Sequence, residues 1–173
     1  MRGPNGDKIR KYQIHWRQAE PCPQECLCCD PSTELVARQI KRFNGDVTKK
    51  WAVYVLECKW ISEKGARTNA MHRFGPESSN AEWIRDASSA RRSLYVGYSK
   101  KLFDQIMAHT SGTTFRFTSV YPPVRLLNVD WYSTIPKAKH EKAKIADWLE
   151  ANLEGTYVYC RGEKLRFRDD PIY

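Results

Sequence analysis

The sequence lacks any long apolar run. No segment approaches the ~20 consecutive apolar residues that a membrane-spanning helix needs, and the N-terminus, Met1–Asn5, lacks the apolar stretch of a signal peptide. It also lacks internal repeats and low-complexity stretches. We therefore expect a protein that does not bind membranes and stays in the cytoplasm, a reducing compartment.

Acidic residues are in short supply. The chain has 20 Asp and Glu against 29 Lys and Arg, which gives a formal charge of +9 over 173 residues. Such a surplus attracts polyanions, because each phosphate that is neutralised releases counterions. Hydrophobic residues make up 41% of the chain, so most of it is expected to be ordered. The composition favours nucleic-acid binding, with a merely solubilising basic surface as the alternative.

Cysteine is present six times, and in a reducing compartment thiols or metal ligands are expected in preference to disulfides. Four of the six, Cys22, Cys26, Cys28 and Cys29, form a Cys-x₃-Cys-x-Cys-Cys cluster. Zinc sites usually pair Cys-x₂-Cys units that lie well apart in sequence, so this cluster is too compact for a standard finger. It could still supply the thiolates of a Zn²⁺ site, and free thiols are the alternative.

Hydrophobic periodicity predicts the order β-β-α-β followed by a long helix. A polar insertion separates the first two strands, and a Thr-rich loop precedes the third. Ser or Thr residues stand where the helices should begin, as expected of N-caps. The expected elements are a helix from 33 to about 43, strands at 51–58, 93–98 and 124–132, a short helix near 80–90, a helix from Ser99 to His109, and a helix over 135–152.

Glu141 is the oddest residue by pattern, because it lies on the apolar stripe of the last helix, between Ala138 and Ile145. An ionised carboxylate on a buried face is costly unless it is paired or binds a metal. The alternative is a glutamate at the edge of the stripe that reaches solvent. Tyr54, Tyr95 and Tyr98 also gather near strand ends, although buried tyrosines with satisfied hydroxyls are common.

Together these residues resemble the GIY-YIG endonucleases. Val53-Tyr54-Val55 and Tyr95-Val96-Gly97 are similar to the two elements that name the family. The later pieces follow in the same order over residues 51–155: a helix ending in His109, Ser111-Gly112, a Thr-containing loop, Tyr121–Leu126, and a lone glutamate in Ala138–Lys142.

The resemblance implies an α/β (α+β) domain at 51–155, with a three-stranded antiparallel sheet flanked by helices and an insertion at 59–92. A Cys-rich and helical extension would precede it at 1–50. The tail at 156–173 is expected to form a basic hairpin. Both extensions lie outside the resemblance, and we expect them to set substrate choice or to bind a protein partner.

The resemblance also implies metal-assisted phosphodiester hydrolysis. Glu141 would bind Mg²⁺ (or Mn²⁺), and Tyr54 and Tyr95 would activate or support the attacking water. Gly97 would let the backbone pass close to the scissile phosphate. Gln105 stands where the family keeps its catalytic arginine, and it cannot supply a charge.

Three further residues complete the expected substrate site. Lys101 lies one turn before Gln105 and could partly replace the arginine, though without its bidentate fork. Tyr98 occupies a position where some members keep a lysine, and Arg116 is the strongest candidate for a substrate contact. His109, at a helix C-terminus, is expected to complement the helix dipole rather than to catalyse.

Two main functions remain open from the sequence, and a zinc-dependent interaction module at the cysteine segment is a third, weaker alternative. The first is a metal-dependent endonuclease acting on nucleic acid, DNA in preference to RNA. The second is a catalytically degenerate GIY-YIG domain that binds nucleic acid or a protein, and Gln105 and Tyr98 favour it.

Overall fold

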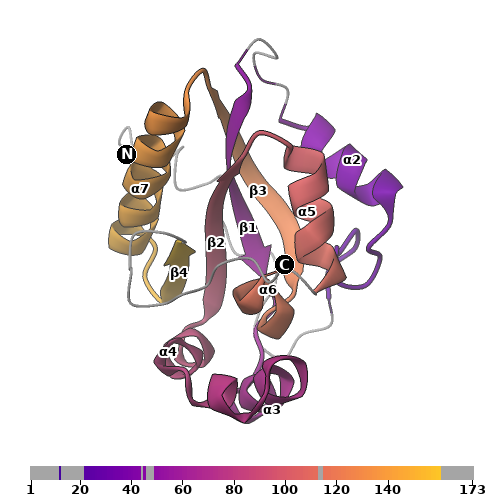
Figure 1. The fold of residues 1–173 in the computed structure, drawn as a ribbon, viewed down its shortest axis with the longest axis vertical. Helices are drawn as coiled ribbons and strands as arrows, with labels where there is room; N and C mark the ends of the chain where they lie inside the picture. Colours follow the sequence, from indigo (N-terminus) through magenta and orange to yellow (C-terminus); the bar gives the residue numbers. More distant parts are fainter. Residues whose placement is uncertain (1–11, 13–21, 44, 46–48, 113–114, 161–173) are drawn as a thin grey trace, which may run out of the picture.

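The computed structural model describes residues 12, 22–43, 45, 49–112 and 115–160. It is an α+β fold in which helices cover both faces of a central sheet (Figure 1). None of the helices in these ranges has the length and apolar character required to cross a membrane. The elements in chain order are α2 (Thr33–Lys41), β1 (Trp51–Cys58), α3 (Glu63–Phe74), the 3₁₀ helix η1 (Pro76–Asn80), α4 (Glu82–Ser89), β2 (Arg92–Ser99), α5 (Leu102–Ser111), α6 (Arg116–Val120), β3 (Pro123–Tyr132), α7 (Ile135–Asn152) and β4 (Thr156–Cys160).

The sheet has the strand order β3-β1-β2-β4. β1 is antiparallel to both of its neighbours, with Tyr54 opposite Gly97 of β2 and opposite Val129 of β3. Seven of its eight residues are buried, as expected of a β-branched and aromatic strand covered on both sides. The three strands predicted from the sequence are therefore confirmed, and so is the long insertion between the first two.

The expected three-stranded antiparallel sheet is wrong, because Thr156–Cys160 adds a fourth strand parallel to β2. α7 returns the chain to the start of β2, where the Arg91 N–H bonds the Gly155 carbonyl at 2.8 Å. The next strand must then run in the direction of β2. The first arm of the predicted C-terminal hairpin thus belongs to the main sheet. Residues 161–173, which would complete that hairpin, lie outside the described residues.

Ser and Thr side chains are expected to cap helices, and two of the three caps expected at α2, α5 and α7 are present. Ser32 Oγ caps α2 at 3.2 Å and Thr134 Oγ1 caps α7 at 3.4 Å, each by accepting an N–H of the first turn. Ser99 does not cap α5. Its hydroxyl accepts the N–H of Lys101 at 3.0 Å, which makes a tight turn, and the helix begins only at Leu102.

The insertion between β1 and β2 contains more helix than the sequence indicated. The predicted short helix is present as α4, and its Trp83 and Ile84 reach the core. α3 was missed because its apolar pattern is weak. Only Ala66 and Ala70 of its twelve residues are buried, so small side chains rather than a hydrophobic stripe let it pack.

Alternating side chains divide the core into two layers. Tyr54 and Leu56 point to one face of the sheet, where α2, α4, α5 and α6 pack, and we call this the α5 face. Val53 and Val55 point to the other, the α7 face, which Ala138 and other residues of α7 cover. Figure 1 shows α5 and α7 on opposite sides of the strands.

The N-terminal segment covers the exposed edge of β3. The Leu27 N–H donates to the Val124 carbonyl at 2.8 Å, and Leu27 itself is fully buried. The Gln39 carboxamide accepts the Leu126 N–H at 2.8 Å and donates to the Glu25 carbonyl at 2.9 Å. These bonds satisfy backbone groups that would otherwise leave an open sheet edge.

Candidate functional site

Three buried side chains on the α5 face are linked in series by hydrogen bonds. The Tyr54 hydroxyl lies 2.8 Å from His109 Nε2, and His109 Nδ1 lies 2.8 Å from Thr118 Oγ1. The Tyr95 ring packs edge-on against the imidazole, with 4.5 Å between centroids. Tyr54 and His109 are 0% exposed and Tyr95 is 2% exposed, so the two tyrosines meet inside the core rather than at the surface.

His109 does not serve as a dipole cap, contrary to our expectation. Its ring is buried and stacks on Phe115 at 4.0 Å, and both nitrogens are engaged. The spacing of Leu102, Ile106 and His109 on one side of α5 was the signal for this burial. A histidine near a helix end nevertheless suggests solvent, which is why its role was misassigned.

Gly97 makes room for the Tyr54 phenol. A Cβ at this position would lie 2.6 Å from the Tyr54 hydroxyl and 2.9 Å from Tyr95 Cε1, both closer than real Cβ contacts. In the structure a protein ring therefore fills the space beside this glycine, where the family resemblance implied a phosphate.

Gln105, Lys101 and Arg116 lie at the periphery of the α5 face. Lys101 is exposed at the N-cap position, and Gln105 follows one turn later and is half-buried. Arg116 begins α6, which forms where the sequence predicted a loop. Its guanidinium lies over the Phe74 ring, 5.6 Å from the centroid. This contact packs Arg116 against α3.

Glu141 opens into a pocket of about 260 Å³ on the α7 face. Asp130 lines the same pocket, and its carboxylate accepts a hydrogen bond from Asn128 Nδ2 at 3.0 Å. Two carboxylates thus share one concave surface. The other lining residues are Tyr12, Tyr132, Ile145 and Trp148.

Charges around this pocket keep Glu141 ionised. Lys137 Nζ lies 3.1 Å and Lys144 Nζ 3.6 Å from Glu141 Oε1, and the hydrogen bond from Lys137 is the main cause of a lowered Glu141 pKa. Burial, helped by the charges of Asp130 and Glu141, raises the pKa of Tyr132 to about 12. Two carboxylates therefore line the pocket, and the exposed ammonium groups of Lys137 and Lys144 lie beside one of them.

The buried stripe of α7 passes beside Glu141, not through it. Lys142 takes the buried position, and its ammonium lies over the Tyr98 ring at 5.1 Å from the centroid. The Glu141 side chain is 16% exposed, at the edge of the stripe. Tyr98 belongs to this face as well, and its ring packs 6.0 Å from that of Trp51.

The structure therefore separates the expected catalytic residues into two sets. Tyr54, Tyr95 and Gly97 gather in the α5 face, and Glu141 and Tyr98 lie on the α7 face. The sheet stands between the two sets.

The cysteine cluster is assembled by a tight turn before α2. The Sγ atoms of Cys26 and Cys28 are 2.9 Å apart, and those of Cys22 and Cys28 are 3.6 Å apart. Hydrogen bonding from Cys28 lowers the pKa of the Cys26 thiol to about 5, and backbone N–H groups of Cys28 and Cys29 add to the effect. One thiolate is thus stabilised within the turn.

These four sulfurs could hold one metal ion. All lie within 4.8 Å of one another. A tetrahedral ion with metal–sulfur bonds of about 2.3 Å needs sulfurs about 3.8 Å apart, so the cluster needs only small adjustments. The turn is positioned by Glu25, whose carboxylate binds Arg38 at 2.9 Å and Arg42 at 2.5 Å on α2.

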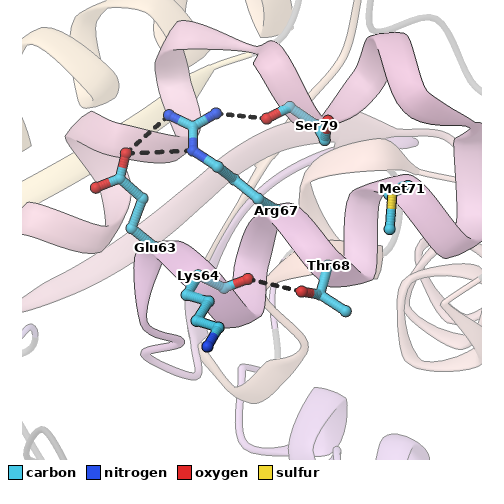
Figure 2. Close-up of a pocket in the computed structure, with 6 residues that line it drawn as sticks. All are labelled: Glu63, Lys64, Arg67, Thr68, Met71 and Ser79. Carbon is cyan, nitrogen blue, oxygen red and sulfur yellow. Dashed lines mark hydrogen bonds and ion pairs between the residues drawn. The ribbon is translucent and has the colours of Figure 1, made fainter.

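A second pocket, of about 450 Å³, lies on the inserted helix α3 (Figure 2). Arg67 spans it, ion-paired to Glu63 at 2.8 Å and hydrogen-bonded to the Ser79 carbonyl. Its lining also includes Thr68 and the exposed Met71, but none of the residues expected to act on a phosphodiester. The pocket lies between α3 and η1, and the polar groups that line it do not converge on a common point.

Comparisons with family models, curated proteins and solved structures found no match to this chain.

Proposed function

We propose that the chain is a nucleic-acid-binding module, built on a GIY-YIG-like domain whose catalytic residues are no longer assembled. One observation carries this proposal: Glu141 lies on the α7 face while Tyr54 and Tyr95 are buried in the α5 face. The formal charge of +9 supports a polyanionic partner.

The separation matters because the chemistry is short-ranged. Oxygen ligands bind Mg²⁺ at about 2.0–2.1 Å, and a tyrosine that activates water must reach the same ion or its hydration shell. Successive side chains of a strand point to opposite faces of the sheet, so the sheet backbone and closely packed side chains separate the two sets of residues. A phosphate held at Glu141 is therefore beyond the reach of the Tyr54 hydroxyl, which His109 already engages.

A metal-dependent endonuclease is the second candidate, and the pocket of Glu141 favours it. Asp130 supplies a second carboxylate there, and hard oxygen ligands are those that Mg²⁺ or Mn²⁺ prefers. Hydrolysis at this pocket would use Glu141 and Asp130 without the two family tyrosines.

Cleavage and binding assays distinguish the two candidates. Labelled duplex, nicked and branched DNA, and RNA, are incubated with wild type and with Glu141→Gln, with and without Mg²⁺ or Mn²⁺. The binding proposal expects complexes that persist without added divalent metal and no cleavage. It also expects that Gln105→Arg restores nothing, since an arginine on α5 stays on the face away from Glu141. Cleavage by wild type that Glu141→Gln abolishes establishes the endonuclease instead.

We further propose that the cysteine cluster binds Zn²⁺. Four thiolates around one ion are the usual donor set of a structural zinc site, and the four sulfurs lie within 4.8 Å of one another. Elemental analysis of the purified protein should find near-equimolar zinc. Cys28→Ser should lose it, and Cys160→Ser, outside the cluster, should retain it. Less than a tenth of an equivalent in wild type would rule the proposal out.

A further inference from the structure

Three passages of the chain meet at one end of the sheet. The register places Trp51 opposite Tyr132 and Ala52 opposite Ser99. The residues before β1, those after β2 and those that lead from β3 into α7 therefore come together there, at the top of Figure 1.

Each of these passages carries a pair of lysines. All six side chains are exposed, and each pair follows or precedes a strand or begins a helix. In the described part of the chain only Lys137 of the six has a carboxylate within ion-pair distance, that of Glu141. The six are Lys49, Lys50, Lys100, Lys101, Lys137 and Lys139, and we call them the lysine end.

The opposite end of the sheet shows no such bias. It is built from α3, η1 and α4, where exposed acids are interspersed among exposed bases, as in Glu63-Lys64 and Arg85-Asp86. Glu63 also ties up the Arg67 guanidinium in an ion pair. The surplus of positive charge on the described surface is thus placed unevenly, and composition alone did not reveal this.

We infer that the lysine end is the surface that contacts the sugar-phosphate backbone of nucleic acid. This inference rests on the proposed function and specifies where the partner lies. Its members are point charges on flexible stems, which suit phosphates and lack the planar fork that reads guanine edges. Because strand ends and the first turn of α7 hold these backbones in place, the six lysine positions have a fixed arrangement. Binding through it is sequence-independent and steeply salt-dependent.

A charge-matched pair of variants tests the inference. The first is Lys50→Gln/Lys100→Gln/Lys101→Gln, at the lysine end. The second is Lys64→Gln/Arg85→Gln/Arg91→Gln, which removes three exposed charges near the opposite end of the sheet. Both carry the same net charge, so a general effect of charge weakens them equally.

Anisotropy of a labelled oligonucleotide is measured against KCl concentration for wild type and both variants. The lysine-end variant should lose about 2–3 from the slope of log K against log salt and bind at least about tenfold more weakly at low salt. The control variant should change the slope by less than about 1. Equal losses in the two variants overturn the inference but leave nucleic-acid binding standing. No binding by wild type overturns the proposed function itself. Matching thermal unfolding midpoints confirm that all three proteins are folded.

Discussion

The two faces of the sheet handle polar groups in opposite ways. On the α5 face, Tyr54, His109 and Thr118 satisfy one another in a dry layer of aromatic rings. On the α7 face, Glu141 and Asp130 open into a pocket whose rim carries lysines. The first arrangement stabilises the fold, and the second remains accessible to a ligand.

This difference shows that a residue singled out by a sequence motif can serve the core instead of a site. Tyr54 and Tyr95, which the sequence suggested as catalytic residues, are buried core residues. Stability should therefore depend mainly on the α5 face, whereas Glu141 and Asp130 on the α7 face should affect ionisation more than stability.

The largest expected effect is loss of the metal that we propose for the cysteine cluster, a turn that is attached to the α5 face through Leu27. A ligand present at a thousand times its Kd stabilises the folded state by about 4 kcal/mol. Cys26→Ser should lower the free energy of unfolding by about that amount, whereas Cys160→Ser should not.

Amide hydrogen exchange then shows which part of the fold loses stability in Cys26→Ser. Cys26→Ser should speed exchange at Leu27 and Leu126, whose N–H groups join the N-terminal segment to the β3 edge, and leave α7 protected. An uncovered edge should also promote self-association, visible by light scattering. Uniform deprotection of both faces would contradict a local role for the cluster.

Much of the fold could be predicted from the sequence, because strong local patterns agree with burial. The run Trp51–Cys58 is mostly apolar, and Pro123–Tyr132 carries Val, Leu and aromatic residues between polar ones; both are strands. β4 was predicted as an arm of a C-terminal hairpin because the sequence of a five-residue strand does not indicate which strand it pairs with. Its pairing with β2 depends on where an eighteen-residue helix returns the chain.

The candidate site could be predicted only in part. Spacing singled out Tyr54, Tyr95 and Glu141, but spacing within each element does not say which face of the sheet a helix will cover. The acidic partner of Glu141 was missed because Asp130 lies in a strand, with no helical pattern to link it to α7. The cysteine cluster was found because its ligands are adjacent in sequence.

The next largest effect contrasts a buried polar residue with an accessible one. His109→Ala removes a ring that satisfies Tyr54 and Thr118 and leaves a cavity, so we expect a loss of about 3 kcal/mol. Glu141→Ala should cost less than about 1 kcal/mol, since its ion pairs lie at an exposed rim. Urea unfolding measures both losses of unfolding free energy. Similar losses for the two variants would contradict a greater structural role for the α5 face.

A smaller effect is expected where the α5 face is tightest. Gly97→Ala would place a methyl group 2.6 Å from the Tyr54 hydroxyl, and overpacking of this kind costs about 1–3 kcal/mol. Gly65→Ala in α3 is the matched control. Its methyl group would lie 3.1 Å from Ser62 Oγ and 3.2 Å from Ile61 Cγ2, which are milder contacts than those at Gly97, and alanine favours a helix over glycine by up to about 1 kcal/mol. The same urea titration should show a clearly larger loss for Gly97→Ala than for Gly65→Ala, and a neutral Gly97→Ala would mean that Tyr54 moves freely.

The smallest effect is electrostatic and belongs to the α7 face. Burial first, and then the charge of Asp130, raise the pKa of Tyr12 and of Tyr132 to about 12, whereas Tyr121 on the α5 face reaches about 12 chiefly through burial. These raised values favour folding below pH 10, and that stability is lost as pH rises from about 10 through 12. Asp130→Asn should lower the pKa of Tyr12 and Tyr132 and leave Tyr121 unchanged. Phenolate absorbance of Asp130→Asn, alone and combined with Tyr132→Phe or Tyr121→Phe, assigns the shift. If the change in titration caused by Asp130→Asn remained in the Tyr132→Phe background and disappeared in the Tyr121→Phe background, it would belong to Tyr121. Asp130 would then act across the sheet, and the two faces would not be electrostatically separate.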